Sequence, residues 1–398
     1  RSAANSCLAC RPTAAFEAFR DVSLKNCRRL GVEQSNTSLL IDDRLIIKVY
    51  RRLQAGTHPE IEIGRFLTDV AHYANAPRLL GSVELLGGDG SVTAVALVQE
   101  FVRNQGDGWA MTLDHLDRVL NEAGMVPPTE SDVFDDEKAH EGYWLLTETL
   151  AGRIGDLHRA FAMDTDDRAF APEPAGPSDI EAWTGQIASL AGKARDTLGR
   201  SVAEGKLGGE GRALAERILD DWGMIERLGV VPADALAGTV KTRIHGDLHL
   251  GQVVVAGTDF YVLDFEGEPL HGLERRRAKS SPLRDVAGMV RSFDYAGNTA
   301  ANKRKSPAAG GEGAALERAT IARWRTTTTT RFLAAYRAAS AGCLSVPQDD
   351  AAFAAAVDAF VLEKALYEVC YDAANRPDWL GIPLAGIARL LDTAKRSG

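Results

Sequence analysis

Residues 243–266 contain the stretch of sequence that decides the fold. Residues 243–255 read RIHGDLHLGQVVV, and residues 262–266 read VLDFE. Two apolar runs, typical of short β-strands, flank a polar loop that contains Asp247. A hairpin that pairs 253–255 with 261–263 would bring Gln252 and Asp264 together, with Asp247 at the same rim.

These side chains have the chemistry that phosphoryl transfer requires. Asp247 can orient an attacking hydroxyl and accept its proton. Gln252 and Asp264 offer oxygen ligands to Mg²⁺, a hard cation, and Glu266 can add a further carboxylate. The spacing from Asp247 to Gln252 matches the D-x-x-x-x-N pattern of the protein-kinase catalytic loop, with Gln in place of Asn. The pattern therefore predicts ATP and Mg²⁺ as cofactors.

A cation for the phosphates is predicted at Lys48, in the apolar run 45–50. A lysine in a buried strand is costly unless a carboxylate pairs with it, and kinases solve this with a helix glutamate. The following helix supplies Glu60 and Glu62. We prefer Glu62 as the partner, because it shares a helix face with Phe66 four residues later.

The remaining nucleotide contacts are expected around the small lobe. Residues 31–38 form a polar turn ahead of the Lys48 strand, and Ser35 there can donate to phosphate although the turn has a single glycine. Glu100 and Val102 end the last strand of this lobe. We expect that segment to be the hinge whose backbone meets adenine.

Apolar periodicity predicts an α+β fold with two lobes, a strand-rich lobe at 1–102 and a helical lobe at 103–398. Strands are expected at 38–41, 45–50, 77–86 and 92–102, with helices at 13–30 and 61–71. Further helices are expected at 113–122, 136–161, 180–201, 211–228 and from 315 onward. The Gly- and Ala-rich segment 297–313 suggests a mobile loop.

Composition favours a small-molecule substrate. The 398 residues are 45% hydrophobic and 25% charged, and the net charge of −9 with no dominant basic run disfavours nucleic acid as a partner. No run approaches the roughly 20 apolar residues of a membrane helix. Five cysteines make a poor disulfide framework, and Cys7 and Cys10 lack a second pair for a metal. We expect a cytoplasmic monomer.

Two other classes of function compete with a kinase. A metal-dependent hydrolase could use His245, Asp247 and His249, but the sequence offers no second cluster of ligands for a two-metal cage. A binding module without catalysis would lack the base Asp247, the metal ligand Gln252 or Asp264, or the lysine Lys48. All four residues are present. The sequence thus favours the kinase.

Four long motifs carry a resemblance to a known family. They are HGDLHLGQ (245–252), VLDFEGEP (262–269), SPLRDVAGMVRSFDYA (281–296) and EKALYEVCYDAANRPDWLGIP (363–383). They resemble the maltokinase-related kinases of actinobacteria, within the aminoglycoside-phosphotransferase and protein-kinase-like fold, and most closely a branch with glucosamine kinase activity. The family carries an extra N-terminal cap, whereas only a short leader precedes the matching part here.

The resemblance implies roles that agree with those argued from the residues. It implies Asp247 as the base, Gln252 and Asp264 as Mg²⁺ ligands and Lys48 as the phosphate anchor. It also implies that Asp285 braces the catalytic loop from a helix N-terminus, where it can equally serve as a helix cap. We expect His245 to support the same loop.

The substrate side is expected on the helix 363–375 and the loop after it. Tyr371 and Trp379 could stack on a pyranose ring, Glu368 and Asp372 could bind hydroxyls or an ammonium group, and His249 lies near the base. The alternative is a salt-bridged packing helix with Trp379 in the core. The preferred reaction is phosphorylation of glucosamine to glucosamine 6-phosphate. Two other acceptors are compatible with these residues: maltose, which would give maltose 1-phosphate, and an aminoglycoside.

Overall fold

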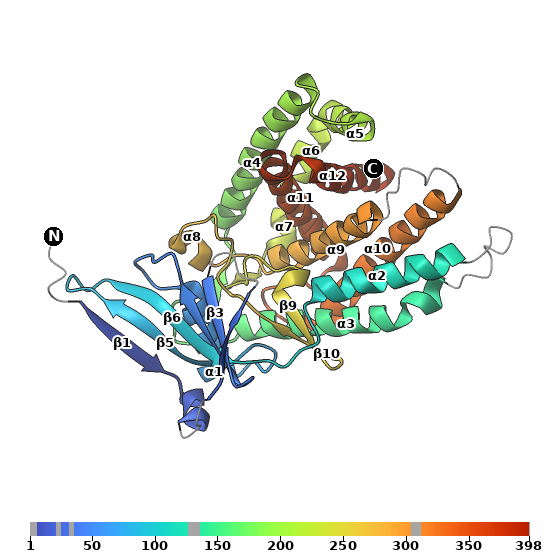
Figure 1. The fold of residues 1–398 in the computed structure, drawn as a ribbon. Coiled ribbons are helices and arrows are strands. Elements are labelled where there is room, and N and C mark those ends of the chain that lie inside the picture. The colour runs from blue at the N-terminus through green and yellow to red at the C-terminus, as the bar shows by residue number, and fades with distance from the viewer. Residues whose placement is uncertain (1–5, 21–24, 32–35, 126–135, 304–311, 398) are drawn as a thin grey trace.

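Strands occupy one end of the molecule and helices fill the remainder (Figure 1). The structure is a computed structural model that describes residues 6–20, 25–31, 36–125, 136–303 and 312–397. The α+β architecture expected from the sequence is confirmed, with a sheet before residue 102 and helices after it. No helix in these ranges is long and apolar enough to span a membrane.

A six-stranded antiparallel sheet forms the first part, in the order β1-β5-β6-β4-β3-β2. The strands are β1 (Cys7–Pro12), β2 (Cys27–Leu30), β3 (Asn36–Ile41), β4 (Leu45–Tyr50), β5 (Leu79–Leu86) and β6 (Val92–Glu100). β4 lies inside the sheet, where Lys48 pairs with Ser38 of β3 and Leu97 of β6. The sheet thus holds the Lys48 side chain among buried neighbours.

Helix α1 (Pro59–Asp69) follows β4 and packs against β5. It begins at Pro59, whose fixed φ suits a first helical turn and whose missing N–H costs nothing there. Ile63, Phe66 and Leu67 are buried on it. These apolar side chains fix the rotation of α1, and with it the directions of its two glutamates.

The helical part surrounds one large apolar core. Its helices are α2 (Gly108–Met125), α3 (Asp136–Phe161), α4 (Pro177–Ala203), α5 (Gly209–Asp220), α6 (Trp222–Leu228), α7 (Ala233–Leu236), α8 (Leu273–Arg277), α9 (Leu283–Lys303), α10 (Glu312–Ala339), α11 (Asp350–Asn375) and α12 (Gly381–Ser397). α9 and α11 pack against each other, and α10 packs against α3. The buried rings of Trp324, Phe332 and Tyr336 on α10 help to fill this core.

Short elements complete the chain. They are the 3₁₀ turns η1 (Ala14–Phe19), η3 (Leu250–Gln252) and η4 (Pro377–Trp379), the small pair β7 (Glu173–Pro174) and β8 (Val240–Lys241), and the hairpin β9 (Val253–Ala256) and β10 (Asp259–Val262). The hairpin packs against α2 and α3, on the side of the helical part that faces the sheet (Figure 1).

Three expected elements are wrong. The helix expected at 13–30 is only the 3₁₀ turn η1, followed by strand β2 along the sheet edge. The helix expected at 211–228 is two helices, which part at Asp221. The loop expected from residue 297 is helical as far as Lys303, because Ala300 and Gly297 are buried in the core and packing there outweighs low helix propensity.

Candidate active site

The hairpin brings Gln252 and Asp264 together, as its sequence predicted. Val253 lies opposite Val262, and the Leu263 N–H donates to the Gln252 carbonyl at 2.8 Å. The Gln252 Nε2 group donates to Asp264 Oδ2 at 3.3 Å. Asp264 has a φ of +59°, in the left-handed region that costs a non-glycine residue roughly 1–2 kcal/mol. This turn points its carboxylate away from the strand and toward the sheet.

Lys48 lies among three carboxylates. Its Nζ atom is 3.0 Å from Glu60, 2.8 Å from Asp264 and 2.6 Å from Glu266. Its side chain is only 6% exposed. Burial alone would lower the pKa of this amine, but the three negative charges outweigh burial and hold the pKa well above its usual value. The lysine is therefore a fixed positive charge between the two parts of the molecule.

Glu60, and not Glu62, is the helix partner of Lys48, so that prediction was wrong. Two residues are about 200° apart around a helix, and the glutamates therefore point to opposite sides. Phe66, which shares the Glu62 face, stacks on Phe170 of the helical part. Glu62 accordingly points away from the sheet and accepts hydrogen bonds from two arginines, Arg243 at 2.6 Å and Arg277 at 2.6 and 2.9 Å.

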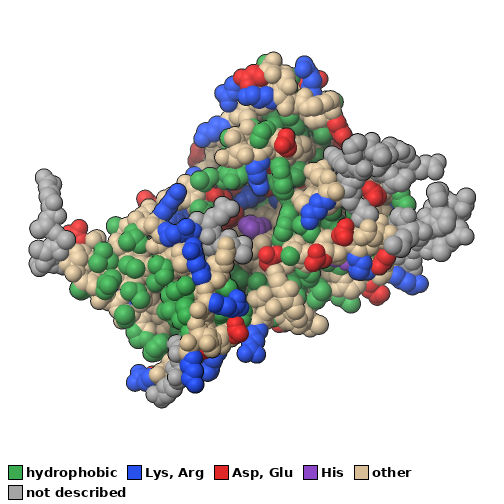
Figure 2. All heavy atoms as spheres, viewed as in Figure 1, with side chains coloured by type: hydrophobic (Ala, Val, Ile, Leu, Met, Phe, Trp, Pro, Cys, Tyr) green, Lys and Arg blue, Asp and Glu red, His purple; other side chains and the backbone are tan. Residues whose placement is uncertain are grey.

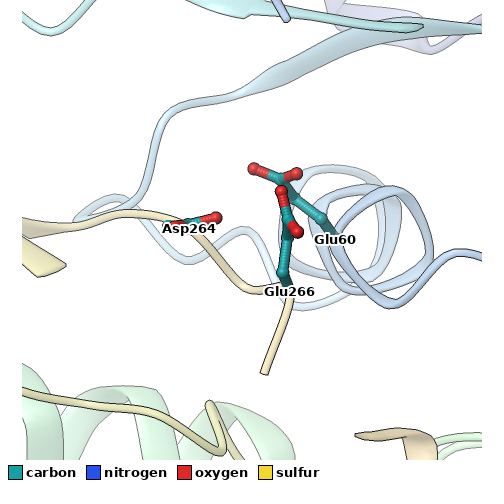
Figure 3. A group of neighbouring side chains, drawn as sticks. All are labelled: Glu60, Asp264 and Glu266. Atoms are coloured by element: carbon teal, nitrogen blue, oxygen red, sulfur yellow. The ribbon is translucent and has the colours of Figure 1, made fainter. Parts of the chain in front are cut away.

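The donor set around Lys48 suits a hard metal ion. Oxygen atoms of Glu60, Asp264 and Glu266 all lie within 4.8 Å of one another. Figure 3 shows the three carboxylates converging, Glu60 from α1 and the other two from the segment after β10. Asn36 Nδ2 donates to Glu266 at 2.8 Å and fixes that side chain. Oxygen-only ligands suit Mg²⁺ and disfavour softer metals. The Lys48 ammonium group lies 2.6–3.0 Å from the same three carboxylates, so a bound ion would have to share them with it.

Asp285 braces the loop that carries Asp247. It lies in the first turn of α9, fully buried, and accepts the backbone N–H groups of His245 at 2.7 Å and Gly246 at 2.9 Å. Its third partner is the His158 ring at 3.2 Å. Burial would raise the pKa of Asp285, but these donors hold it below its usual value. The expected bracing geometry is present.

His245 supports the loop from within. Its ring Nδ1 accepts the Asp247 N–H at 3.3 Å, and its Nε2 lies 2.8 Å from the Leu263 carbonyl. The first contact requires an unprotonated Nδ1, so Nε2 carries the proton and donates to Leu263. The imidazole thus ties the catalytic loop to the segment that leads into Asp264.

Asp247 faces a cavity of about 210 Å³. Residues of four segments line it: α4 through Trp183 and Gln186, the catalytic loop, the segment 267–288, and α11 through Phe360, Glu363, Lys364 and Tyr367. In the space-filling view, the surface is hollowed between the sheet and the helices, with basic side chains around the hollow (Figure 2). The Asp247 side chain is 19% exposed, and Lys364 Nζ lies 3.2 Å from its Oδ1.

Two of the predicted sugar ligands on α11 are buried in ion pairs. Glu368 accepts both Nε and Nη2 of Arg291, at 2.9 and 2.7 Å. Asp372 accepts the Tyr295 hydroxyl at 2.6 Å and the Arg376 guanidinium at 2.9 Å. These contacts are those of the packing alternative, and the role of both carboxylates in substrate binding stays a prediction.

Tyr371 and Trp379, the rings predicted to stack on the sugar, both lie against an arginine. The Arg376 guanidinium lies 5.0 Å from the Tyr371 ring centre and 5.1 Å from that of Trp379. Trp379 also stacks on Tyr295, with 6.1 Å between centroids. Both rings are partly exposed. The Nδ1 atom of His249, the other predicted substrate residue, accepts the Gly251 N–H at 3.0 Å. Sugar contacts by these three residues stay predictions.

The expected adenine contacts are only partly described. Glu100 is held by Arg78, whose Nε donates to it at 2.7 Å, and the Val102 carbonyl accepts from Asn104 at 2.8 Å. Ser35 lies outside the described residues. The hinge and phosphate roles of these residues therefore stay predictions.

Sequence reasoning gave no role at the base to two groups near Asp247, Lys364 and Glu268. Both lie in the quoted motifs, in EKALYE and DFEGEP, and both line the cavity. The sequence offered one weak signal for them, because each is a charged residue beside an apolar run that is typical of a helix or a strand. Only the folded structure shows that they meet at the base.

The chain is similar in sequence and in fold to known proteins. No family model matches the chain. Curated relatives named glucosamine kinase occur in Mycolicibacterium smegmatis, 28% identical over 92% of this chain and 79% of the relative, and in Streptacidiphilus jiangxiensis, 25% identical over 96% and 77%. A solved structure described as glucosamine kinase in complex with glucosamine, ADP and inorganic phosphate superposes with a TM-score of 0.69 at 23% identity, covering 98% of this chain and 80% of that one. The likeness to glucosamine kinases that the motifs predicted is confirmed. The chain shares the two-lobed, kinase-like fold of that solved structure.

Proposed function

We propose that this protein is an ATP- and Mg²⁺-dependent kinase that phosphorylates glucosamine to glucosamine 6-phosphate. The observation that carries the proposal is the meeting of two half-sites. Lys48 from the sheet contacts Asp264 after the hairpin, and Asp247, in the loop before the hairpin, faces a cavity. Two curated relatives, of which this chain covers 79% and 77%, are named glucosamine kinase, which supports this choice of acceptor.

Each residue has one task in the proposed reaction. Asp247 orients the acceptor hydroxyl and takes its proton as the oxygen attacks the γ-phosphorus atom, and ADP leaves as the bond from that atom to the β-phosphate oxygen breaks. Lys48 neutralises the phosphates. Gln252 and Asp264, with Glu266, would hold Mg²⁺, which supplies further positive charge to the phosphate oxygens when bound. Residues 1–102 are the nucleotide lobe in this proposal, and residues 103–398 carry the base and the sugar site.

The state of Asp247 suits a base. Burial would raise its pKa, but the charge of Lys364, with smaller contributions from His249 and His245, holds the pKa below its usual value. The carboxylate is therefore ionised at neutral pH and ready to accept a hydrogen bond from a hydroxyl. A neutral Asp247 could not take the proton.

ADP release with Mg-ATP tests the function against glucosamine, glucose, maltose and an aminoglycoside. We expect glucosamine to have the largest kcat/KM, with glucosamine 6-phosphate identified by ³¹P NMR. Asp247→Asn should lose about 10²-fold or more in kcat, as is usual for a general base. Asp392→Asn is the control, because it alters only the exposed pair with Arg217. A preference for maltose would overturn the choice of glucosamine as the acceptor. Near-normal turnover by Asp247→Asn would refute the assignment of Asp247 as the base.

A further inference from the structure

Lys364 of α11 is the cation that faces the proposed base. Its Nζ lies 3.2 Å from Asp247 Oδ1 and 3.9 Å from Glu268 Oε2. In the described part of the chain, no other lysine, arginine or histidine nitrogen lies within ion-pair distance of Asp247. The contact joins residues 117 positions apart, so it exists only once α11 has packed beside the catalytic loop.

Lys364 is itself held firmly in place. Its ammonium group lies 5.2 Å from the centre of the Tyr367 ring, one turn further along α11, a geometry that favours a cation. Burial alone would lower its pKa, but the charges of Asp247, Glu368 and Glu268 outweigh burial and raise it. The lysine therefore stays protonated through the neutral range, with its charge directed at Asp247.

We propose that Lys364 is the positioning residue of the catalytic base, which holds the Asp247 carboxylate ionised and aimed into the cavity. The inference rests on the proposed function, because it assigns a partner to the base of that reaction. Asp247 and Lys364 line the same cavity, so the acceptor hydroxyl would approach a carboxylate whose other side is already occupied by an ammonium group.

The other groups around Asp247 cannot replace this charge. His245 and His249 lie in its own loop, and Glu268 and His271 come from the segment after β10. Burial holds the pKa of both His249 and His271 below the usual value, so these two rings are neutral at pH 7. Glu268 is an acid and opposes ionisation of its neighbour. Without Lys364, the largest influence that opposes the effect of burial on Asp247 would be lost.

Three variants test the inference: Lys364→Met, Lys364→Arg and the control Lys241→Met. Lys241 is a similarly buried lysine, 21% exposed, that pairs with Glu173 and Asp179 instead. We expect Lys364→Met to lose about 10²-fold in kcat, the scale of a disabled general base, while KM for ATP changes little. Lys364→Arg should recover at least about tenfold of this loss, because a cation is restored beside the carboxylate.

The pH profile separates positioning from a merely structural role. Removing the cation should raise the pKa of Asp247, so the acidic limb of kcat/KM should move up by about one pH unit or more in Lys364→Met. It should stay in place in Lys364→Arg and Lys241→Met. An unmoved acidic limb together with near-normal kcat in Lys364→Met would overturn the inference. If Lys364→Met fails to fold, Lys364→Arg provides the test, and a 10²-fold loss in kcat in the folded Lys364→Arg protein would overturn the inference. A wild-type enzyme inactive on every sugar would instead refute the proposed function.

Discussion

Lys48 is the residue on which the two halves of the candidate site converge. Its three carboxylate partners come from α1 and from the segment after the hairpin, and the amine is almost wholly buried. A buried ammonium group needs such compensation, because an unpaired charge in the interior costs several kcal/mol. When a nucleotide binds, its phosphates would compete for the same amine. Glu60, on the sheet side, is then the partner that keeps Lys48 in place.

Replacing Glu60 with Gln should therefore damage nucleotide use. The change replaces the carboxyl group 3.0 Å from Lys48 and weakens the acceptor of the Tyr50 hydroxyl. We expect kcat/KM for ATP to fall about 10²-fold, because a displaced anchor misplaces the reacting phosphate. Steady-state kinetics at varied ATP measure this. Glu84→Gln, which alters a pair with half-exposed Arg11 at the sheet edge, should stay within about twofold. Equal kinetics of the two variants would contradict the role of Glu60.

Local spacing explains which residues the sequence could place. Gln252 and Asp264 are joined by one tight hairpin, so their meeting follows from strand alternation alone. The choice between Glu60 and Glu62 depended on the rotation of α1, which its packing against the helical part decides. Lys364 reaches the base from a helix distant in sequence, and no periodicity in the chain encodes that contact.

At the scale of elements, α9 carries the catalytic loop on one of its faces. Asp285 binds the backbone of the loop at residues 245 and 246, and the Ser292 hydroxyl accepts the Leu250 N–H at 3.3 Å. Gly288 lies between them, and these positions, three and four residues apart, share one helix face. A Cβ atom at Gly288 would collide with the carbonyl oxygen of Leu248. The loop thus lies directly on the helix backbone.

Gly288→Ala should push the catalytic loop away from α9. We expect a loss of about 1–3 kcal/mol in the free energy of unfolding, as for other overpacked sites, and at least about tenfold in kcat. Gly152→Ala in α3 is the matched control, since an added methyl group meets no atom within 4 Å there. That control should be neutral or gain up to about 1 kcal/mol from helix propensity. Denaturant unfolding and steady-state kinetics of both variants test this prediction. Unchanged stability and kcat in Gly288→Ala would show that the loop does not lie tightly against α9 at Leu248.

Long periodic helices were predictable, and short edge elements were not. The helix Asp136–Phe161 has the bounds that its apolar spacing predicted. The segment 13–30 also has helical spacing, yet residues Cys27–Leu30 pair with β3. Backbone hydrogen bonds to an existing sheet outweigh a weak helical preference in so short a segment. Packing within the core likewise extended α9 past Gly297.

At the scale of the whole molecule, buried polar contacts hold the sheet against the helical part. Asn75 donates to the carbonyl of Phe260, in strand β10 of the hairpin, at 2.9 Å. Glu62 of α1 binds Arg243, just before the catalytic loop, and Arg277 at the end of α8. Arg243 is 1% exposed and lies over the Phe170 ring at 5.1 Å. Glu62 is the residue that neutralises this buried guanidinium.

Glu62→Gln should therefore destabilise the whole chain, where Glu60→Gln chiefly impairs nucleotide use. It leaves Arg243 buried without a carboxylate, and breaking such a pair costs about 3–5 kcal/mol. Urea unfolding at pH 7 measures the loss of stability. The chain should unfold in a single transition if this contact joins the sheet to the helical part. Glu216→Gln, in an exposed helical pair with Arg212, should cost less than about 1 kcal/mol.

The pH dependence of that loss identifies its electrostatic origin. Burial would raise the pKa of Glu62, but Arg277 and Arg243 hold it below its usual value of 4.5. A lowered pKa in the folded state gives stability that is present above pH 4.5 and disappears as pH falls through the folded pKa. The difference in unfolding free energy between wild type and Glu62→Gln should thus be largest near neutral pH and shrink in acid below pH 4.5. A difference that stays constant across this range would mean that Glu62 stabilises the molecule by shape and packing, and that the charge between α1 and the helical part contributes nothing.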